Sequence, residues 1–157
     1  MTTYYGNYTH ALDSQCRVSL PSDWRIKDGD TELILAPTSD DALILLPPEQ
    51  LDAFFEKMKT ASITNSKIQR ALAGFGKLCK KCKCDRQGRI ALDRAMLDSI
   101  GVGSQVQLSG AVTQIRISAP AKTDDINISE ALAALDEINS LLSGSVDNAI
   151  KNILGGK

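Results

Sequence analysis

Short apolar runs bounded by turn residues recur in two separate stretches of the chain, a pattern that is typical of β-strands. The first stretch predicts strands at Glu32–Ala36 and Ala42–Leu46, and the second predicts strands at Gln105–Leu108 and Gln114–Ser118. Each pair follows a glycine-containing turn and ends at a proline: Asp28–Asp30 and Gly101–Gly103 for the turns, and Pro47, Pro48 and Pro120 for the ends. Two similar groups of short strands indicate a β-rich α+β fold.

The two groups of strands belong to an internal repeat. Asp13–Leu20 and Asp85–Leu92 align at an offset of 72 residues, with Asp, Gln, Arg and Leu identical. A short stretch with helical potential comes next in both copies, at Ser22–Ile26 and Arg94–Ile100. Isolated hairpins are marginally stable in water because one face stays uncovered. We therefore expect the copies to pack on each other as an intramolecular pseudo-dimer that forms a β-barrel.

Helical periodicity appears between the copies. Glu49–Thr60 predicts a helix with one apolar face, made of Leu51, Phe54, Phe55 and Met58. A second helix is expected from about Asn65 to Phe75. Its boundary signals are Asn65 or Ser66 as the N-cap and Gly74 or Gly76 as the stop. These apolar faces indicate core and inter-subunit packing.

The end of the chain has no counterpart in the repeat. Ala121–Ile128 has the composition of a polar linker, Ser129–Leu142 predicts an amphipathic helix, and Val146–Leu154 predicts a shorter segment. The apolar stripe of the helix consists of Leu132, Leu135, Ile138, Leu141 and Leu142. The expected organisation is a first half at 4–48, connecting helices at 49–76, a second half at 77–120, and a linker with a helical tail at 121–157.

The composition is that of an ordinary globular protein, with 43% hydrophobic and 24% charged residues. No apolar run approaches the roughly 18–20 residues that cross a bilayer. The first residues lack the basic and then apolar segments of a signal peptide. We expect a cytoplasmic protein with no membrane partner.

Charge is unevenly distributed along the chain. The net charge of −1 argues against a general polyanion binder. Between Lys77 and Arg94, however, seven basic residues stand against two acidic ones, an excess of five positive charges. The basic residues are Lys77, Lys80, Lys81, Lys83, Arg86, Arg89 and Arg94. Both a solvated strand face and a nucleic-acid contact agree with this cluster.

Three of the four cysteines fall within six residues, at Cys79, Cys82 and Cys84. With Cys16 or His10 as a fourth ligand, they could form a structural zinc site. Strand alternation argues against it, because Cys82 and Cys84 would share a face that Cys79 does not. Free cysteines also pack well as small apolar residues. We expect no metal and no cofactor.

Sequence features of an enzyme are missing. His10 is the one histidine, and it is interpreted as a polar strand residue. The chain has no pattern of nucleophile and base, no glycine-rich phosphate loop and no clustered acid pair. We therefore expect neither catalysis nor a small-molecule substrate.

The chemistry of the chain is concentrated in an Asp-x-x-x-Arg motif at the head of each copy. It consists of Asp13 with Arg17 and of Asp85 with Arg89. In a turn, the carboxylate can hold the guanidinium in one orientation through a charge-assisted bond. An arginine fixed in this way can contact guanine in the major groove or bind a phosphate. One copy alone would indicate a structural salt bridge, whereas two matching copies favour DNA binding.

These residues resemble a known family. Leu12–Pro21 resembles the first signature of the MraZ family, Leu-Asp-x-Lys-Gly-Arg followed by an apolar stretch and proline. Asp85–Ile90 resembles the second signature, and Ile68–Leu72 resembles the central helix of the family. The resemblance covers about residues 4–120. It implies tandem SpoVT-AbrB half-domains in a ring-shaped, octamer-like homo-oligomer.

The resemblance also implies a function. Members of the family are expected to bind double-stranded DNA at short repeats in the promoter of the division and cell-wall gene cluster, which places them at the nucleoid. The expected DNA-binding residues are Arg17, Arg89, Arg86, Gln87, Gln15 and Lys83, with Asp13 and Asp85 orienting the two motif arginines.

One departure from the family pattern affects the first motif. Gln15 and Cys16 stand where the family has Lys-Gly. Cys16 enters a positive-φ turn at a higher cost than glycine does, and the missing lysine removes one phosphate contact. We therefore expect the first hairpin to be reshaped or weaker on DNA, and the second to be the better DNA-binding hairpin.

A function from another class is an antitoxin-like AbrB-fold module that binds a protein partner through the C-terminal helix. The amphipathic tail motivates this alternative. Antitoxins of that type usually carry one half-domain per chain, so the tandem repeat argues against it.

Overall fold

The computed structural model describes residues 2–26, 30–38, 40–120 and 128–155, without the side chains of 54, 57, 58, 60–62 and 142–155. It divides into two units, Met1–Ala121 and Lys122–Lys157. The turn expected at Asp28–Asp30 and the linker expected at Ala121–Ile128 lie largely outside the described residues.

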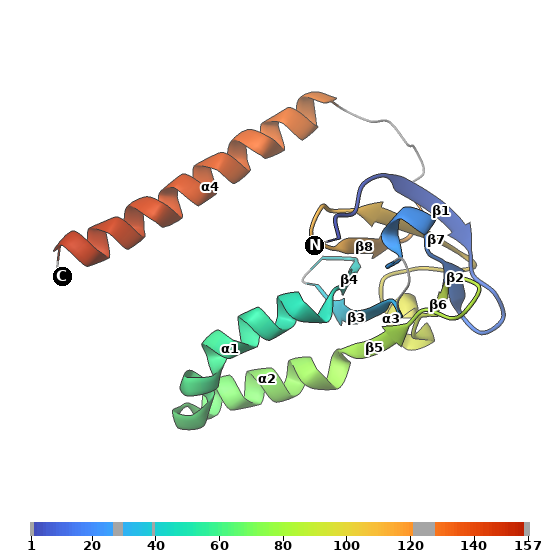
Figure 1. The fold of residues 1–157 in the computed structure, drawn as a ribbon, viewed down its shortest axis with the longest axis horizontal. Helices are drawn as coiled ribbons and strands as arrows, with labels where there is room; N and C mark the ends of the chain where they lie inside the picture. The colour runs from blue at the N-terminus through green and yellow to red at the C-terminus, as the bar shows by residue number, and fades with distance from the viewer. Residues whose placement is uncertain (1, 27–29, 39, 121–127, 156–157) are drawn as a thin grey trace. The chain divides into compact units, whose positions relative to one another are not determined.

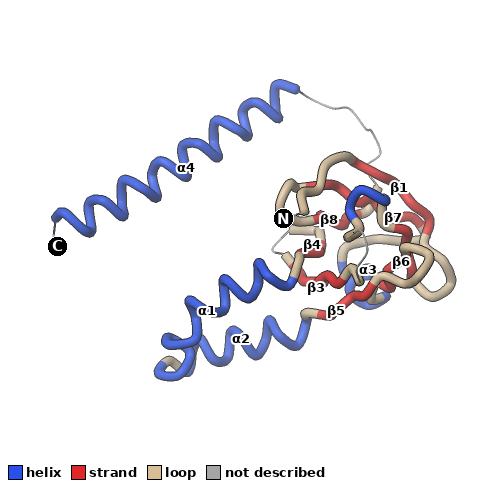
Figure 2. The backbone as a smooth tube through the Cα atoms, in the orientation of Figure 1, coloured by secondary structure: helices blue, strands red, loops and turns tan. Residues whose placement is uncertain are grey.

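The described residues of the first unit form eight strands (Figures 1 and 2). They are β1 (Asn7–Ala11), β2 (Arg17–Ser19), β3 (Glu32–Pro37), β4 (Leu43–Leu46), β5 (Lys80–Lys83), β6 (Arg89–Ala91), β7 (Gln105–Gly110) and β8 (Ile115–Ser118). Six of them make an antiparallel sheet in the order β1-β7-β8-β4-β3-β5, and β2 pairs with β6 as a separate two-stranded ribbon. The four strands predicted from the apolar runs are confirmed, and so is the α+β class.

The sheet order is unchanged when the strands of the first copy are exchanged with those of the second. The register of the strand pairs has the same symmetry. The pairing of His10 with Val106 between β1 and β7 corresponds to the pairing of Cys82 with Leu33 between β5 and β3. Strands of the two copies are therefore interleaved within one sheet and share one ribbon. The expected closed barrel is not found, since β1 and β5 are the two edges of the described sheet and do not pair with each other.

The hydrophobic core lies between the six-stranded sheet and the ribbon. Both copies contribute matching buried side chains from the sheet: Leu33, Leu35, Leu43 and Leu45 from the first, and Val106, Leu108, Ile115 and Ile117 from the second. The ribbon adds Val18 and Ile90, which pair directly with each other. Burying these faces against one another is what stabilises hairpins that would be marginal alone.

Short helical segments follow the ribbon strands in both copies, as predicted. In the first copy it is a 3-10 turn, η1 (Ser22–Trp24), and in the second it is α3 (Arg94–Ser99), which ends before Gly101 at φ 76°. Trp24 and Leu97 bury their side chains in the core. These segments close the side of the core next to the ribbon.

The two helices predicted between the copies are present as α1 (Pro48–Thr64) and α2 (Ser66–Leu78). Asn65 is the N-cap of α2, because its side chain accepts hydrogen bonds from the backbone N–H groups of Lys67 and Ile68. The expected stop at Gly74 or Gly76 is wrong, since α2 continues through both. A helical glycine costs only about 1 kcal/mol, and neither residue takes the left-handed conformation that ends helices.

α1 and α2 lie side by side as a hairpin next to β3 (Figure 1). Phe55 and Phe75 hold the two helices together, with ring centroids 6.5 Å apart in an edge-to-face arrangement. Ile34 points to the helical side of the sheet and is buried. The hairpin therefore covers the face of β3 that does not contact the core.

The second unit is one helix, α4 (Ile128–Gly155). The prediction of two separate segments is wrong, because the backbone stays helical through Ser143-Gly144-Ser145. Among side chains of α4 that the structure describes, the exposed large apolar ones are Ile128, Leu132, Leu135, Ile138 and Leu141. In the described part of the chain, no helix combines the length and hydropathy that a bilayer-spanning helix needs.

Candidate nucleic-acid interface

The β2–β6 ribbon separates an apolar face from a polar one. Val18 and Ile90 point into the core, so strand alternation places Arg17 and Arg89 on the opposite, outward face. Each arginine begins its strand. In this antiparallel ribbon they occupy diagonal positions, which brings side chains from the two copies within reach of each other.

Each arginine is fixed by the turn that precedes it. In the first turn, Asp13 Oδ1 accepts hydrogen bonds from the backbone N–H groups of Gln15 (2.9 Å) and Arg17 (2.8 Å), and Oδ2 accepts from Arg17 Nε (2.7 Å). In the second turn, Asp85 makes the same three bonds, with Gln87 N–H (2.9 Å), Arg89 N–H (2.9 Å) and Arg89 Nε (3.0 Å). The motif therefore forms a turn in which one carboxylate orders both the backbone and the guanidinium.

Both turns pass through a left-handed residue at the same position, Cys16 with φ 56° and Gly88 with φ 79°. The expected reshaping of the first turn is not observed, because both turns are closed by matching bonds. The N–H of Cys16 donates to Asp13 O (3.0 Å), and that of Gly88 donates to Asp85 O (3.1 Å). A left-handed conformation is unfavourable for a residue other than glycine, but Cys16 adopts it and the first turn keeps the same hydrogen bonds as the second.

The two motifs meet through Asp13. Its Oδ2 lies 2.7 Å from Arg17 Nε and 3.8 Å from Arg89 Nη1. The side chains of Arg17 and Arg89 are 30% and 28% exposed, so both guanidinia are held against the ribbon but reach solvent. The outward face of the ribbon thus presents two oriented arginines from two copies of the repeat.

Hydrogen bonding in the turns favours the ionised carboxylates. The backbone N–H of Arg17 is the largest cause that lowers the pKa of Asp13 below its ordinary 3.8. The backbone N–H of Arg89 does the same for Asp85. Partial desolvation opposes these shifts but does not cancel them.

This pKa lowering predicts acid sensitivity of the turns. Carboxylates with a lowered pKa stabilise the fold above their unfolded-state value of 3.8, and that stabilisation is lost as pH falls through the folded value. We expect the melting temperature to be nearly constant from pH 5 to 8 with respect to these groups, and to fall below about pH 4. The melting temperature of the double variant Asp13→Asn, Asp85→Asn should fall less steeply at acid pH than that of the wild type. The same pH dependence in both proteins would contradict a stabilising role of the two carboxylates.

The other predicted DNA-binding residues are placed in two groups. Gln15, Arg86 and Gln87 are exposed at the tips of the two turns, beside the motif arginines. Lys83 lies on β5 instead, where its Nζ is 2.9 Å from Asp30 Oδ2. That hydrogen bond raises the pKa of Lys83, so the lysine is charged and already paired.

Acidic residues offset much of the basic cluster, and two of them, Asp30 and Asp98, lie outside Lys77–Arg94. Besides Lys83 with Asp30, the pairs are Lys80 with Asp93 (2.9 Å), Arg94 with Asp98 (2.9 Å), and Arg89 with Asp85 (3.0 Å). The excess of positive charge counted along the sequence is therefore smaller in the structure. What remains on the second copy is concentrated at Lys77, Lys81 and Arg86, for which the described residues supply no ion pair.

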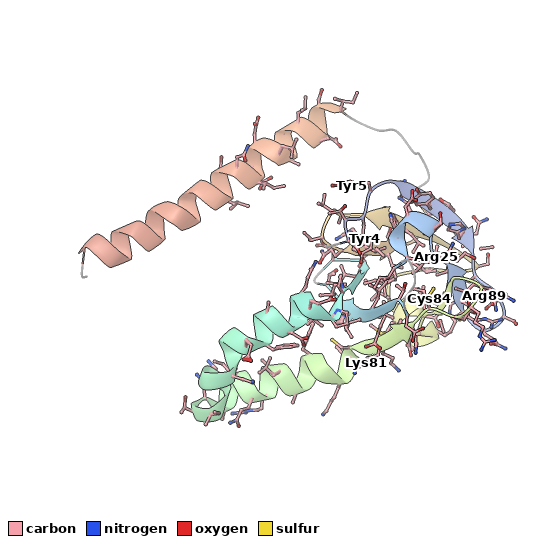
Figure 3. All side chains as sticks on the ribbon, viewed as in Figure 1. Tyr4, Tyr5, Arg25, Lys81, Cys84 and Arg89 are labelled. Carbon is pink, nitrogen blue, oxygen red and sulfur yellow. The ribbon has the colours of Figure 1, made fainter. Side chains whose placement is uncertain are left out.

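Sequence reasoning missed Arg25, which lies directly against the second turn. Figure 3 shows Arg25, Cys84 and Arg89 at the same end of the β-rich body. A Cβ atom on Gly88 would lie 2.1 Å from Arg25 Nη1, so glycine is what permits this contact. Arg25 belongs to neither motif, and no spacing in the sequence relates it to Gly88.

The cysteines do not gather into one site. Cys82 is buried in the core, Cys79 caps the end of α2, and Cys84 packs at the core margin. Among the described residues, no group of three potential ligands could hold a metal ion. Burial raises the pKa of the Cys82 thiol to about 11 and also raises those of Cys79 and Cys84, which favours protonated thiols over metal-binding thiolates. His10 lies on β1 opposite Val106, as predicted for a strand residue.

Comparison with known proteins identifies relatives across most of the chain. No protein-family model matches. The transcriptional regulator MraZ of Clostridium tetani is 26% identical over 124 residues, which are 79% of this chain and 87% of the relative. The MraZ proteins of Clostridium acetobutylicum (27% over 124 residues, 79% and 87%) and Alkaliphilus metalliredigens (28% over 130 residues, 80% and 90%) are similar to the same extent. These matches agree with the paired Asp-x-x-x-Arg turns and support the resemblance of the chain to the MraZ family.

Proposed function

We propose that the chain is a sequence-specific, DNA-binding transcriptional regulator whose DNA contact is the outward face of the β2–β6 ribbon. The observation that carries the proposal is the convergence of Arg17 and Arg89 around Asp13, at 2.7 and 3.8 Å. Its relatives are named transcriptional regulators. A repeat that served only to build a core would not require an oriented arginine at the same outward position in both copies.

The chemistry of the turns suits base recognition. A guanidinium held in one orientation can donate two parallel hydrogen bonds to guanine O6 and N7, and glutamine can do the same with adenine. Arg17 and Arg89 supply the first kind of group, and Gln15 and Gln87 at the turn tips supply the second. Arg86 and Lys83 are assigned to backbone phosphates because both are exposed cations outside the oriented pair, although Lys83 also forms an ion pair with Asp30.

The symmetry of the sheet supports the proposal that the two halves are SpoVT-AbrB domains joined as a pseudo-dimer. In this arrangement one chain presents two half-sites where a single-copy protein would need two chains. We further propose a ring-shaped homo-oligomer, in which successive chains contact successive DNA repeats. Linked weak contacts then reach high affinity through effective concentration. The expected targets are promoter repeats of division and cell-wall genes, at the nucleoid.

The antitoxin-like alternative is not favoured. It depended on the apolar stripe of α4, whereas the relatives that match most of the chain are named transcriptional regulators. The tandem copies, which share one sheet and one ribbon, also differ from one half-domain per chain.

A gel-shift titration of the purified protein on its own upstream region, beside a scrambled duplex of equal length, tests the function. We expect the upstream duplex to be retarded at lower protein concentration at the same salt. Equal retardation of both duplexes, or none, would contradict sequence-specific binding.

The shared position of Asp13 predicts an asymmetry between the two carboxylates. Asp13→Asn removes the charge that faces both Arg17 and Arg89, whereas Asp85→Asn affects Arg89 alone. We expect a several-fold greater loss of affinity for the upstream duplex from Asp13→Asn. Fluorescence anisotropy with both variants measures this, and equal losses would show that the bridge from Arg89 to Asp13 does not matter for binding.

A further inference from the structure

We propose that the pocket behind the second turn binds a phosphate of the DNA backbone through Arg25 and Arg86. This inference rests on the proposed DNA-binding function. The pocket has a volume of about 330 Å³, and its lining includes both arginines, Ser22 and Gly88. It also includes Asp85, which orients Arg89. Residues of the second turn, which is expected to contact the bases, therefore form part of the pocket wall.

Arg25 is an arginine with unsatisfied donors. It comes from the first copy, just after η1, and its guanidinium lies against Gly88 of the second copy. Its Nε is buried and has no hydrogen-bond partner among the described residues. Arginine carries five N–H donors, and buried donors in folded proteins are nearly always paired. The described residues supply no hydrogen bond to the rest of this guanidinium either, so an acceptor from outside the chain could bind to its Nη groups at the pocket that Arg25 lines.

Arg94 provides an internal comparison. It lies against the first turn as Arg25 lies against the second, with Nη1 4.0 Å from Cys16 Sγ. Its donors are used within the protein: Nε donates to Asp98 Oδ1 (2.9 Å), Nη1 donates to the carbonyl of Gly103 (3.1 Å), and Nη2 donates to the carbonyl of Val102. The two arginines occupy similar places, but the described residues supply hydrogen-bond acceptors to the side chain of Arg94 alone.

The local charge leaves room for an anion. Asp30 and Asp85 also line the pocket, but each carboxylate already faces a cation, at 2.9 Å from Lys83 Nζ and 3.0 Å from Arg89 Nε. Arg25 and Arg86 then remain as two positive charges without an acidic partner among the described residues. The planar fork of a guanidinium fits phosphate oxygens, and two forks with a serine hydroxyl make a suitable donor set.

The DNA backbone is the phosphate source that the position favours. Arg86 lies at the tip of the second turn, three residues from Arg89, so a duplex contacted by Arg89 brings its backbone to this turn. Phosphate contacts fix the register of a protein on DNA without carrying sequence information. The pocket would therefore hold the second turn at a set depth in the groove.

The test compares Arg25→Gln, Arg25→Lys and Arg94→Gln in the full chain, on the upstream and the scrambled duplex, over a range of salt concentrations. Arg25→Gln should lower the affinity for both duplexes by the same factor, on the order of ten-fold. The slope of log affinity against log salt should become shallower by about one for each subunit on DNA. Arg25→Lys keeps the charge and should keep the slope. Arg94→Gln should lower the melting temperature but leave the slope unchanged.

Three outcomes would overturn the inference. An unchanged affinity and slope for Arg25→Gln would do so, and so would a loss confined to the upstream duplex with an unchanged slope, which would make Arg25 a positioning residue for the turn. The third outcome involves millimolar inorganic phosphate. If phosphate raised the melting temperature of the wild type but not that of Arg25→Gln, and did not compete with DNA for binding, the pocket would be a site for free phosphate. Failure of the wild type to bind either duplex would instead refute the proposed function.

Discussion

Replacing both motif arginines, in the double variant Arg17→Ala, Arg89→Ala, is expected to abolish preference for the upstream duplex. Each arginine that makes a bidentate base contact contributes about 1–3 kcal/mol of discrimination, or roughly 5-fold to 150-fold in affinity. Both guanidinia face Asp13, so the effects of the two substitutions are coupled. The loss of binding free energy in the double variant will therefore differ from the sum of the losses in the single variants. Anisotropy titrations of the single and double variants give the coupling directly.

Arg116→Ala is the matched control for the double variant. Arg116 lies on β8, away from the ribbon, and its Nη2 is 3.2 Å from Asp40 Oδ2 in an exposed ion pair. Exposed pairs of this kind contribute only about 0–1 kcal/mol to stability. The control should therefore bind both duplexes like the wild type. A loss of binding equal to that of the double variant would indicate a general charge effect rather than a contact by the ribbon.

The largest expected effect on stability is that of Gly110→Ala. A Cβ atom at this position would lie 2.5 Å from the backbone C and O atoms of Tyr4 and from the backbone N of Tyr5. Backbone cannot move aside as a side-chain end can, and the N-terminal segment is pinned there by the bridge between Tyr4 and Val112. Overpacking of this kind costs about 1–3 kcal/mol. Urea denaturation followed by Trp24 fluorescence measures it, since Tyr4 packs on Trp24.

Gly74→Ala is the control with the opposite sign. It lies inside α2 with nothing within 4 Å of an added Cβ atom. Alanine is favoured over glycine in a helix interior by about 0.5–1 kcal/mol, so this variant should be stabilised. If both variants were destabilised equally, the close contact at Gly110 would not be the cause.

The internal repeat carried most of the prediction of the fold. A shared motif at a fixed offset located both ribbon strands, and short apolar runs between turns located four strands of the sheet. The strand order could not be predicted, because it depends on which copy each edge strand joins. β1 pairs with β7 and β3 with β5, so strands far apart in sequence lie side by side. The predicted β-barrel is not confirmed, because the described sheet keeps two edges, β1 and β5.

Helix boundaries show a second limit of the sequence. Gly74 was expected to stop α2, but the packing of Phe75 on Phe55 holds the helix beyond it. Contacts between helices outweigh a local propensity of about 1 kcal/mol. Periodicity therefore located the helix, whereas its end depended on a tertiary contact.

The candidate site was predictable in its motif and not in its surroundings. Asp-x-x-x-Arg gave the pairing of each carboxylate with its own arginine. The contact between Arg89 and Asp13 joins two copies and appears only when the ribbon is formed. Likewise, Arg25 reaches Gly88 across the two copies, and the acids that pair with the basic cluster come from several elements.

The ratio of affinities for the upstream and scrambled duplexes shows whether the ribbon arginines recognise the DNA sequence, when it is measured at one salt concentration for the wild type and for Arg17→Ala, Arg89→Ala. We expect a wild-type ratio well above one that falls to about one in the double variant, with the melting temperature nearly unchanged because both side chains lie on the outward face of the ribbon. A double variant that folds and keeps the wild-type ratio would contradict this expectation.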